Sequence, residues 1–119
     1  MDARTLGRWG EERAARYLRR KGYAIEGMNV CCRMGEIDII ARKRGIVAFV
    51  EVKLRKNAVF AEAREFVTRS KQEKIRTAAE LWLSENESPL QPRFDVIEIY
   101  APDGPDGPVK IEHIEDAFQ

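Results

Sequence analysis

Four charged residues interrupt the two most strand-like runs of the sequence. The first run contains Glu36 and Asp38, and the second contains Glu51 and Lys53. A carboxylate beside a covered core is costly to desolvate, so such groups are normally paired with a cation or bound to a metal ion. These four residues are therefore the first candidates for chemistry.

The alternation of side chains along each run predicts which of these groups lie together. Successive residues of a strand point to opposite faces, so Glu51 and Lys53 share a face, as do Glu36 and Asp38. The other face of the first strand is expected to be apolar, formed by Ile37, Ile39 and Ala41.

The second run, residues 46–54, is predicted to be a central strand. It is apolar on both faces for most of its length, which is typical of a strand covered on both sides. Residues 42–45 form a short turn between the two runs, which predicts an antiparallel hairpin. We therefore expect the two acid-bearing strands to be neighbours.

A fourth carboxylate comes from a predicted helix over residues 6–21. Its apolar residues recur at spacings of three and four, and Gly22 ends it. Glu11 borders the apolar stripe, because Ala14 and Leu18 stand three and seven positions further on, whereas Glu12 lies on the opposite side. One carboxylate of this helix is thus expected to point inward.

Two interpretations of these groups are open. Glu51 and Lys53 could form a partly exposed ion-pair ladder, worth at most about 1 kcal/mol. Adding Asp38 and Glu11 leaves surplus negative charge, which suits a divalent cation better. Oxygen ligands without His or Cys favour Mg²⁺ or Mn²⁺, and such an ion activates water for attack on a phosphodiester. Lys53 could orient that water or neutralise the charge that develops on phosphorus.

The remaining elements predict the fold class. Further strands are expected at residues 23–30 and 93–100, with a weak edge strand at 109–114 after a turn at 102–108. A second helix is expected to begin with the capping box Ser70 to Glu73 and to end near Ser84. The order predicts one α/β or α+β domain over residues 1–119, a mixed sheet flanked by helices, with its core at about 5–101.

Composition limits the partners. The chain has 21 basic and 20 acidic residues and a net charge of +1, so attraction to nucleic acid must be local. The basic clusters are either solvated surface or contacts to phosphate. They are Arg19 to Lys21, Arg42 to Arg44, Lys53 with Arg55 and Lys56, and Lys71 with Lys74.

Other features favour a cytoplasmic protein without a membrane anchor. No run approaches the roughly 18 apolar residues of a membrane helix, and the N-terminus lacks the apolar part of a signal peptide. Cys31 and Cys32 are adjacent, so they cannot form an ordinary disulfide with each other and are expected to be reduced thiols. His113 is expected to lie on the surface.

The spacing of the charged residues also carries a resemblance. Asp38, followed after twelve residues by Glu51-Val52-Lys53, looks like the D…(D/E)-X-K signature of the restriction-endonuclease-like superfamily, with Ile37 in place of its usual Pro. More closely, the chain resembles the YraN family of bacterial proteins, often compared with archaeal Holliday-junction resolvases. This resemblance rests on five motifs in order: GRWGEERAARYLRRKGY, GEIDIIAR, VAFVEVKLR, SKQEKI and RFDVIEIY.

The resemblance implies a restriction-endonuclease-like fold and a metal-dependent endonuclease acting on structured or branched DNA. Its catalytic residues would be Glu11, Asp38, Glu51 and Lys53. Asp38 and Glu51 would hold Mg²⁺ or Mn²⁺, with Glu11 through water and the Val52 backbone carbonyl as further ligands. Glu36 belongs to the GEID motif but receives no assigned role.

Binding residues and alternatives complete the expectations. Lys71 and Gln72 match a family position that contacts phosphate at a helix N-terminus, and Arg55 and Lys56 are expected to bind the DNA backbone. A homodimer is expected by analogy with resolvases. The alternatives are a non-catalytic nucleic-acid-binding module with the same fold and a structural adaptor that uses the sheet edge or the face around Trp9.

Overall fold

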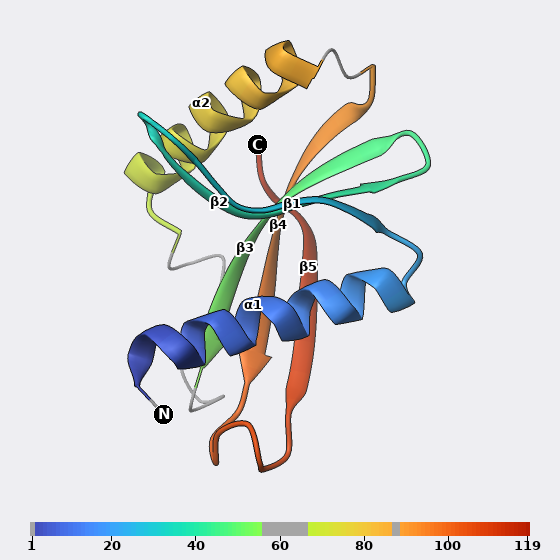
Figure 1. Cartoon of the computed structure of the whole chain (residues 1–119). Coiled ribbons are helices and arrows are strands. Elements are labelled where there is room, and N and C mark those ends of the chain that lie inside the picture. Colours follow the sequence, from blue (N-terminus) through green and yellow to red (C-terminus); the bar gives the residue numbers. More distant parts are fainter. Residues whose placement is uncertain (1, 56–66, 87–88) are drawn as a thin grey trace.

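A computed structural model describes residues 2–55, 67–86 and 89–119 of the chain (Figure 1). The elements follow in the order α1 (Ala3–Arg20), β1 (Ala24–Cys32), β2 (Gly35–Lys43), β3 (Ile46–Arg55), α2 (Arg69–Asn86), β4 (Gln91–Tyr100) and β5 (Lys110–Phe118). All the predicted helices and strands are present, and the weak edge strand is a full strand of nine residues. The DNA contact predicted for Lys56 lies outside the described residues.

The five strands form one mixed sheet in the order β1-β2-β3-β4-β5. The β3 and β4 strands are parallel and the other neighbours are antiparallel. Figure 1 shows α1 on one side of the sheet and α2 on the other, with α2 connecting β3 to β4. This α/β arrangement confirms the predicted fold class, and its order is compatible with a restriction-endonuclease-like fold.

The α1 helix forms where its signals predict it, with a start three residues earlier. The Asp2 side chain caps it by accepting a hydrogen bond of 2.8 Å from the Thr5 amide. Gly22 follows the helix with φ of +94°, a conformation that glycine adopts without strain. Its buried stripe is Gly10, Ala14, Ala15 and Leu18, so the helix covers the sheet with small residues and one leucine.

The α2 helix covers the opposite face, but its cap differs from the prediction. The cap is Thr68, whose hydroxyl accepts a hydrogen bond of 3.1 Å from the Lys71 amide, and Ser70 lies inside the first turn. A Thr two residues upstream offers the same chemistry as Ser, which is why the capping-box pattern placed the start too late. Ala78 and Ala79 belong to the same buried cluster as Phe49, and the partly buried Trp82 and Leu90 pack against it.

The β3 strand is central and covered on both sides, as predicted. Ala48 and Val50 belong to the cluster under α1, and Val47 and Phe49 belong to the cluster under α2. All four side chains are at most 1% exposed. This strand therefore holds the rest of the sheet in place relative to both helices.

The β2 strand separates from β3 part-way along its length. The ladder between them runs from the turn to the pair Ile39 and Val50, and β3 continues beyond it beside β4 alone. The prediction that Ile37 shares a face with Ile39 and Ala41 is wrong: Ile37 packs in the α2 cluster, whereas the other two pack under α1. In Figure 1 the β1–β2 hairpin bends toward α2, which explains the change of side.

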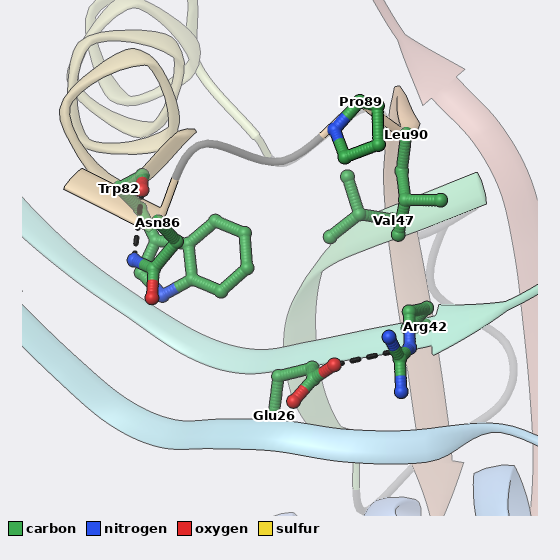
Figure 2. A pocket seen from close by; sticks show the side chains of 7 residues that line it. All are labelled: Glu26, Arg42, Val47, Trp82, Asn86, Pro89 and Leu90. Atoms are coloured by element: carbon green, nitrogen blue, oxygen red, sulfur yellow. Dashed lines mark hydrogen bonds and ion pairs between the residues drawn. The ribbon is translucent and has the colours of Figure 1, made fainter. Parts of the chain in front are cut away.

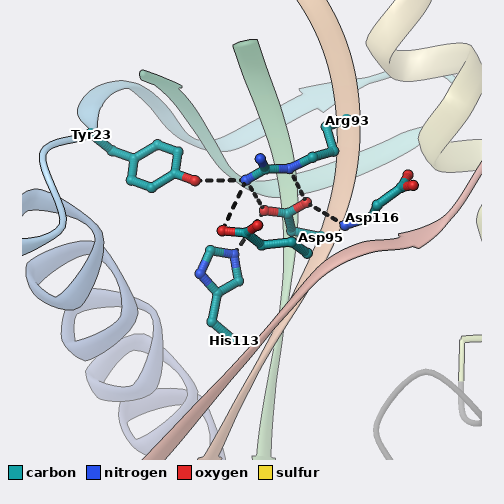
Figure 3. Close-up of polar contacts among 6 residues, drawn as sticks. Tyr23, Arg93, Asp95, His113 and Asp116 are labelled. Carbon is teal, nitrogen blue, oxygen red and sulfur yellow. Dashed lines mark hydrogen bonds and ion pairs between the residues drawn. The ribbon is translucent and has the colours of Figure 1, made fainter. Parts of the chain in front are cut away.

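A buried polar network links β4, β5 and the segment after α1 (Figure 3). Asp95 is fully buried. It accepts two hydrogen bonds of 2.8 Å from Arg93 and one of 3.0 Å from the Asp116 amide, and its Oδ2 lies 2.7 Å from His113 Nε2. Burial alone would raise the pKa of Asp95, but the hydrogen bonds from His113, Arg93 and Asp116 outweigh burial and lower it. Arg93 also donates to the Tyr23 hydroxyl at 2.6 Å.

The surface position expected for His113 is therefore wrong. Its side chain is 6% exposed and its ring packs edge-on against Tyr17, with the ring centres 5.6 Å apart. The sequence places His113 in a predicted edge strand, but it does not reveal that His113 pairs with the buried Asp95. Among the described residues, no helix combines the length and the apolar character needed to cross a membrane.

Candidate metal and nucleic-acid site

Three carboxylates gather at the point where β2 leaves β3. Glu11 comes from the middle of α1, and Glu36 and Asp38 come from β2. One oxygen from each lies within 4.8 Å of the others. The helix acid is half-buried, while Glu12 on the next position is exposed. The inward position predicted for Glu11 is confirmed.

The separation of the strands determines where Asp38 points. Beyond the Ile39 and Val50 pair, the β3 backbone lacks a β2 partner, so the Val52 amide needs another acceptor. Asp38 Oδ2 accepts that hydrogen bond at 2.8 Å. The carboxylate is thereby held at a defined place beside β3 by a bond to the backbone.

The environment of Asp38 opposes its negative charge. Burial, the charge of Glu51 and the charge of Glu11 raise the pKa of Asp38 to about 7 from its ordinary value of 3.8, although the Val52 hydrogen bond and Lys71 act in the opposite direction. A divalent cation would remove this penalty, because it stabilises the ionised form.

Glu51 is paired with two lysines. It is 5% exposed, and its Oε1 lies 2.7 Å from Lys71 Nζ and 3.5 Å from Lys53 Nζ. The ion pair between Glu51 and Lys53 that the sequence allowed is therefore present, but the shorter contact comes from α2. Burial alone would lower the pKa of Lys71, but the hydrogen bond and charge of Glu51 outweigh it and raise the pKa.

Asn29 on β1 completes the group. In the amide orientation that satisfies its neighbours, its nitrogen donates to both Oε atoms of Glu11, at 3.2 and 3.1 Å, and to Glu36 Oε1 at 2.7 Å. Asn29 has φ of +50°, a conformation that Asn adopts more readily than most residues. The neutral Asn29 amide therefore bridges the carboxylates of Glu11 and Glu36 without adding a charge.

A cleft opens from the acids toward the start of α2. It encloses about 320 Å³. Its two walls are the end of the β1–β2 hairpin and the first two turns of α2. The residues that line it are Gly35, Glu36, Asp38, Thr68, Ser70, Lys71, Lys74 and Ile75. Acids and lysines therefore face one opening, which is wide enough to admit a phosphate group.

The donor set fits a hard divalent cation. Glu11, Glu36 and Asp38 offer only carboxylate oxygens, which are the ligands that Mg²⁺ and Mn²⁺ prefer. The grouping differs from the expected ligand set in one member, since Glu36 joins Asp38 while Glu51 contacts lysines. Glu51 and Asp38 are nevertheless close enough for the charge of one to raise the pKa of the other.

The residues predicted to contact DNA differ in their position relative to this cleft. Lys71 lines it, whereas the Gln72 amide donates to the Val67 carbonyl at 2.8 Å. Arg55 lies in β3 with its Nε 3.1 Å from a carboxylate oxygen of the buried Glu98, which also accepts from the Tyr100 hydroxyl. Among the described residues predicted to bind DNA, Lys71 is thus the one that faces the acids.

Comparison with known proteins assigns the chain to a family. The model of the uncharacterised protein family UPF0102 matches residues 10–99. The chain belongs to this family. The YraN family, which the five motifs resemble, is UPF0102, so the resemblance is confirmed.

Relatives match nearly the whole UPF0102 chain. The UPF0102 protein of Nocardia farcinica is 45% identical over 118 residues, covering 98% of this chain and 91% of the relative. That of Caldanaerobacter subterraneus is 41% identical over 119 residues, covering 99% and 98%. Their names state the family and no activity.

Sequence reasoning missed two residues of this UPF0102 site. Asn29 went unnoticed because it lies in the modest first strand and no charge marks it, although Asn within a strand is a signal of unusual backbone. Lys74 was noted only as part of a basic cluster, and its position in the cleft follows from the helical spacing of three from Lys71.

Proposed function

We propose that this protein is a metal-dependent endonuclease that hydrolyses phosphodiester bonds in structured or branched DNA. The observation that carries the proposal is the convergence of Glu11, Glu36 and Asp38 within 4.8 Å at the strand separation, with the Glu51 and lysine pairs beside it. A DNA substrate would place the protein in the cytoplasm, and a two-fold branched substrate would suit a homodimer.

In this proposal the chain's own residues hold the substrate and orient the attacking water. A Mg²⁺ or Mn²⁺ ion held by Asp38 and its neighbouring acids would supply an activated water and stabilise the leaving oxygen. Lys53 would orient that water beside Glu51. Lys71 would exchange its contact with Glu51 for a DNA phosphate, which would release the Glu51 carboxylate to the ion.

A second candidate function is a non-catalytic DNA-binding module. The observation that favours it is the saturation of Glu51, which already has ammonium groups at 2.7 and 3.5 Å. If those pairs persist when DNA binds, Glu51 does not reach the ion. Both candidates predict DNA binding, and they differ in cleavage.

The test uses a panel of labelled single-stranded, duplex, flap and four-way DNAs with Mg²⁺ or Mn²⁺. We expect cleavage of at least one branched substrate, and we expect Glu51→Gln to abolish it while DNA binding persists. Glu12→Gln is the matched control, because Glu12 is exposed on the other side of α1. Binding without cleavage of any substrate would favour the second candidate, and neither binding nor cleavage would reject both.

A further inference from the structure

A second pocket lies at the opposite end of α2 from the acids (Figure 2). It encloses about 270 Å³. Its lining comes from β1, β2, β3, the last turns of α2 and the two residues that precede β4. The residues are Glu26, Arg42, Val47, Trp82, Asn86, Pro89 and Leu90. None of them belongs to the site described above.

The walls of this pocket are apolar and one of them is aromatic. In Figure 2 the Trp82 indole stands on one side, and Val47, Pro89 and Leu90 stand across from it. An edge-on contact with Phe49, with ring centres 5.9 Å apart, holds the indole in place. A flat, apolar group could therefore insert beside Trp82 without reorganising the ring.

The rim of the pocket is polar and carries an exposed cation. Arg42 Nε lies 3.1 Å from Glu26 Oε1, and the Arg42 side chain is 53% exposed. Asn86 Nδ2 donates to the Trp82 carbonyl at 2.8 Å, which fixes the amide and leaves its oxygen as an acceptor. Arg44, in the turn two residues after Arg42, is also exposed.

We propose that this pocket binds one unstacked nucleobase from a single-stranded part of the DNA substrate. Its volume lies just below the range of about 300–1,000 Å³ typical of ligand pockets, which suits a single ring system better than a whole nucleotide. An aromatic wall beside an exposed arginine is a combination that binds single strands, since a base stacks on the ring and the cation attracts the phosphates. The bases of an intact duplex are stacked and cannot enter.

The position of the pocket specifies the substrate further, an inference that rests on the proposed function. Arg42 follows Asp38 by four residues of β2, about 13 Å at 3.3 Å per residue. Trp82 follows Lys71 by eleven residues of α2, about 16 Å at 1.5 Å per residue. A stacked strand advances 3.4 Å per nucleotide, so about four or five nucleotides separate the pocket from the acids. The substrate class is thus a fork or flap with a single-stranded arm of at least that length.

The experiment measures binding in EDTA, where cleavage cannot occur. The protein carries Trp9→Phe, so that Trp82 is the one remaining tryptophan of the two in the sequence. The probes are an octamer of thymidylate and an octamer of abasic sites with the same phosphates. We expect the thymidylate octamer to quench Trp82 emission and to bind about 10-fold more tightly than the abasic octamer, as one stacked base contributes. Trimers should bind more weakly than octamers, because they cannot span from the acids to the pocket.

Two variants control for the indirect effects of substitution. Trp82→Leu in the wild-type background, followed by the anisotropy of labelled octamers, should abolish the preference for bases while affinity for the abasic octamer stays unchanged. Trp9→Leu is the matched control on α1 and should keep the preference. If Trp82→Leu fails to fold, Arg42→Gln with Arg44→Gln in the Trp9→Phe protein replaces it, and should weaken thymidylate quenching several-fold.

Each contrary outcome would overturn the inference in a recognisable way. Equal affinity for both octamers would reject a base pocket, and cleavage of branched DNA by the same preparation after Mg²⁺ or Mn²⁺ is restored would show that the proposed function survives. Equal quenching by free thymidine monophosphate would reassign the pocket to a mononucleotide. Quenching that grows with protein concentration without DNA would assign it to a second copy of the chain.

Discussion

Replacing Asp38 by Asn should stabilise the metal-free protein, and increasingly so as the pH rises. The pKa of Asp38 is raised to about 7 from 3.8, so the folded protein binds this proton more tightly than the unfolded chain. The favourable contribution of the protonated group is complete below pH 3.8 and is lost as the pH rises through 7. The Asp38→Asn variant has no such group and keeps its stability.

The size of the effect follows from the shift. Roughly three pKa units at 1.36 kcal/mol each give a ceiling of about 4 kcal/mol above pH 7, of which roughly 2–3 kcal/mol develops between pH 5 and pH 8. Glu11 and Glu51 can relax when Asp38 ionises, and Asn accepts the Val52 hydrogen bond less strongly than a carboxylate does. We therefore expect the variant to gain about 1–2 kcal/mol over the wild type between these two pH values.

Urea denaturation in EDTA at pH 5 and pH 8 measures this difference. Asp106→Asn is the matched control, because Asp106 is exposed in the turn before β5, and it should change little between the two pH values. Excess Mn²⁺ should erase the advantage of Asp38→Asn at pH 8, since the ion stabilises the wild-type acids. A variant that is less stable than the wild type at pH 8 by the same amount as at pH 5 would refute this reasoning.

Three further predictions follow from the same structure. Mn²⁺ or Mg²⁺ at 100 times its Kd should raise the unfolding free energy of the wild type by about 2.7 kcal/mol. Calorimetry should find no such binding in the double variant Asp38→Asn, Glu51→Gln, and equal binding by this variant would refute the metal site. Lys71→Ala should destabilise the protein by about 1–2 kcal/mol in urea, because it removes the shorter of the two lysine contacts of the buried Glu51 and leaves the 3.5 Å contact with Lys53. Lys74→Ala should have an effect below about 0.5 kcal/mol, and similar losses in both variants would contradict the pairing. Asp95→Asn should lower the unfolding free energy by about 3 kcal/mol at pH 7. Because the pKa of Asp95 is lowered in the folded protein, the stability that its charge contributes is lost as the pH falls below about 3.9, so the difference between wild type and variant should narrow in acid. A difference independent of pH would show that the charge of Asp95 is not what stabilises the protein.

The order of elements and the central strand could be predicted because local signals agree with the packing. A continuous apolar run predicted β3, and the helical stripe of Ala14, Ala15 and Leu18 predicted α1. The start of α2 was misplaced because Thr68 and Ser70 are both good caps, and only the packing of the helix decides between them.

The sequence identified several of the charged residues that meet at the candidate site, but not how they pair. Residue types and spacing identified Glu11, Asp38, Glu51 and Lys53, since charges within apolar strands are rare. The contact of Lys71 with Glu51 and the contact of Asn29 with two acids join elements that are distant in sequence. The side change at Ile37 also escaped prediction, because it arises from the bending of a strand rather than from its period.

The hydrogen bond from the Val52 amide to Asp38 gives the site a built-in spectroscopic reporter. This proton is held by a side chain rather than by a neighbouring strand, so its NMR frequency and its exchange with solvent follow the charge of one carboxylate. Protonation of Asp38, arrival of a cation and docking of DNA would each move this single backbone resonance differently. The occupancy of the site could therefore be followed in the unmodified protein, without a label at the acids and without waiting for turnover.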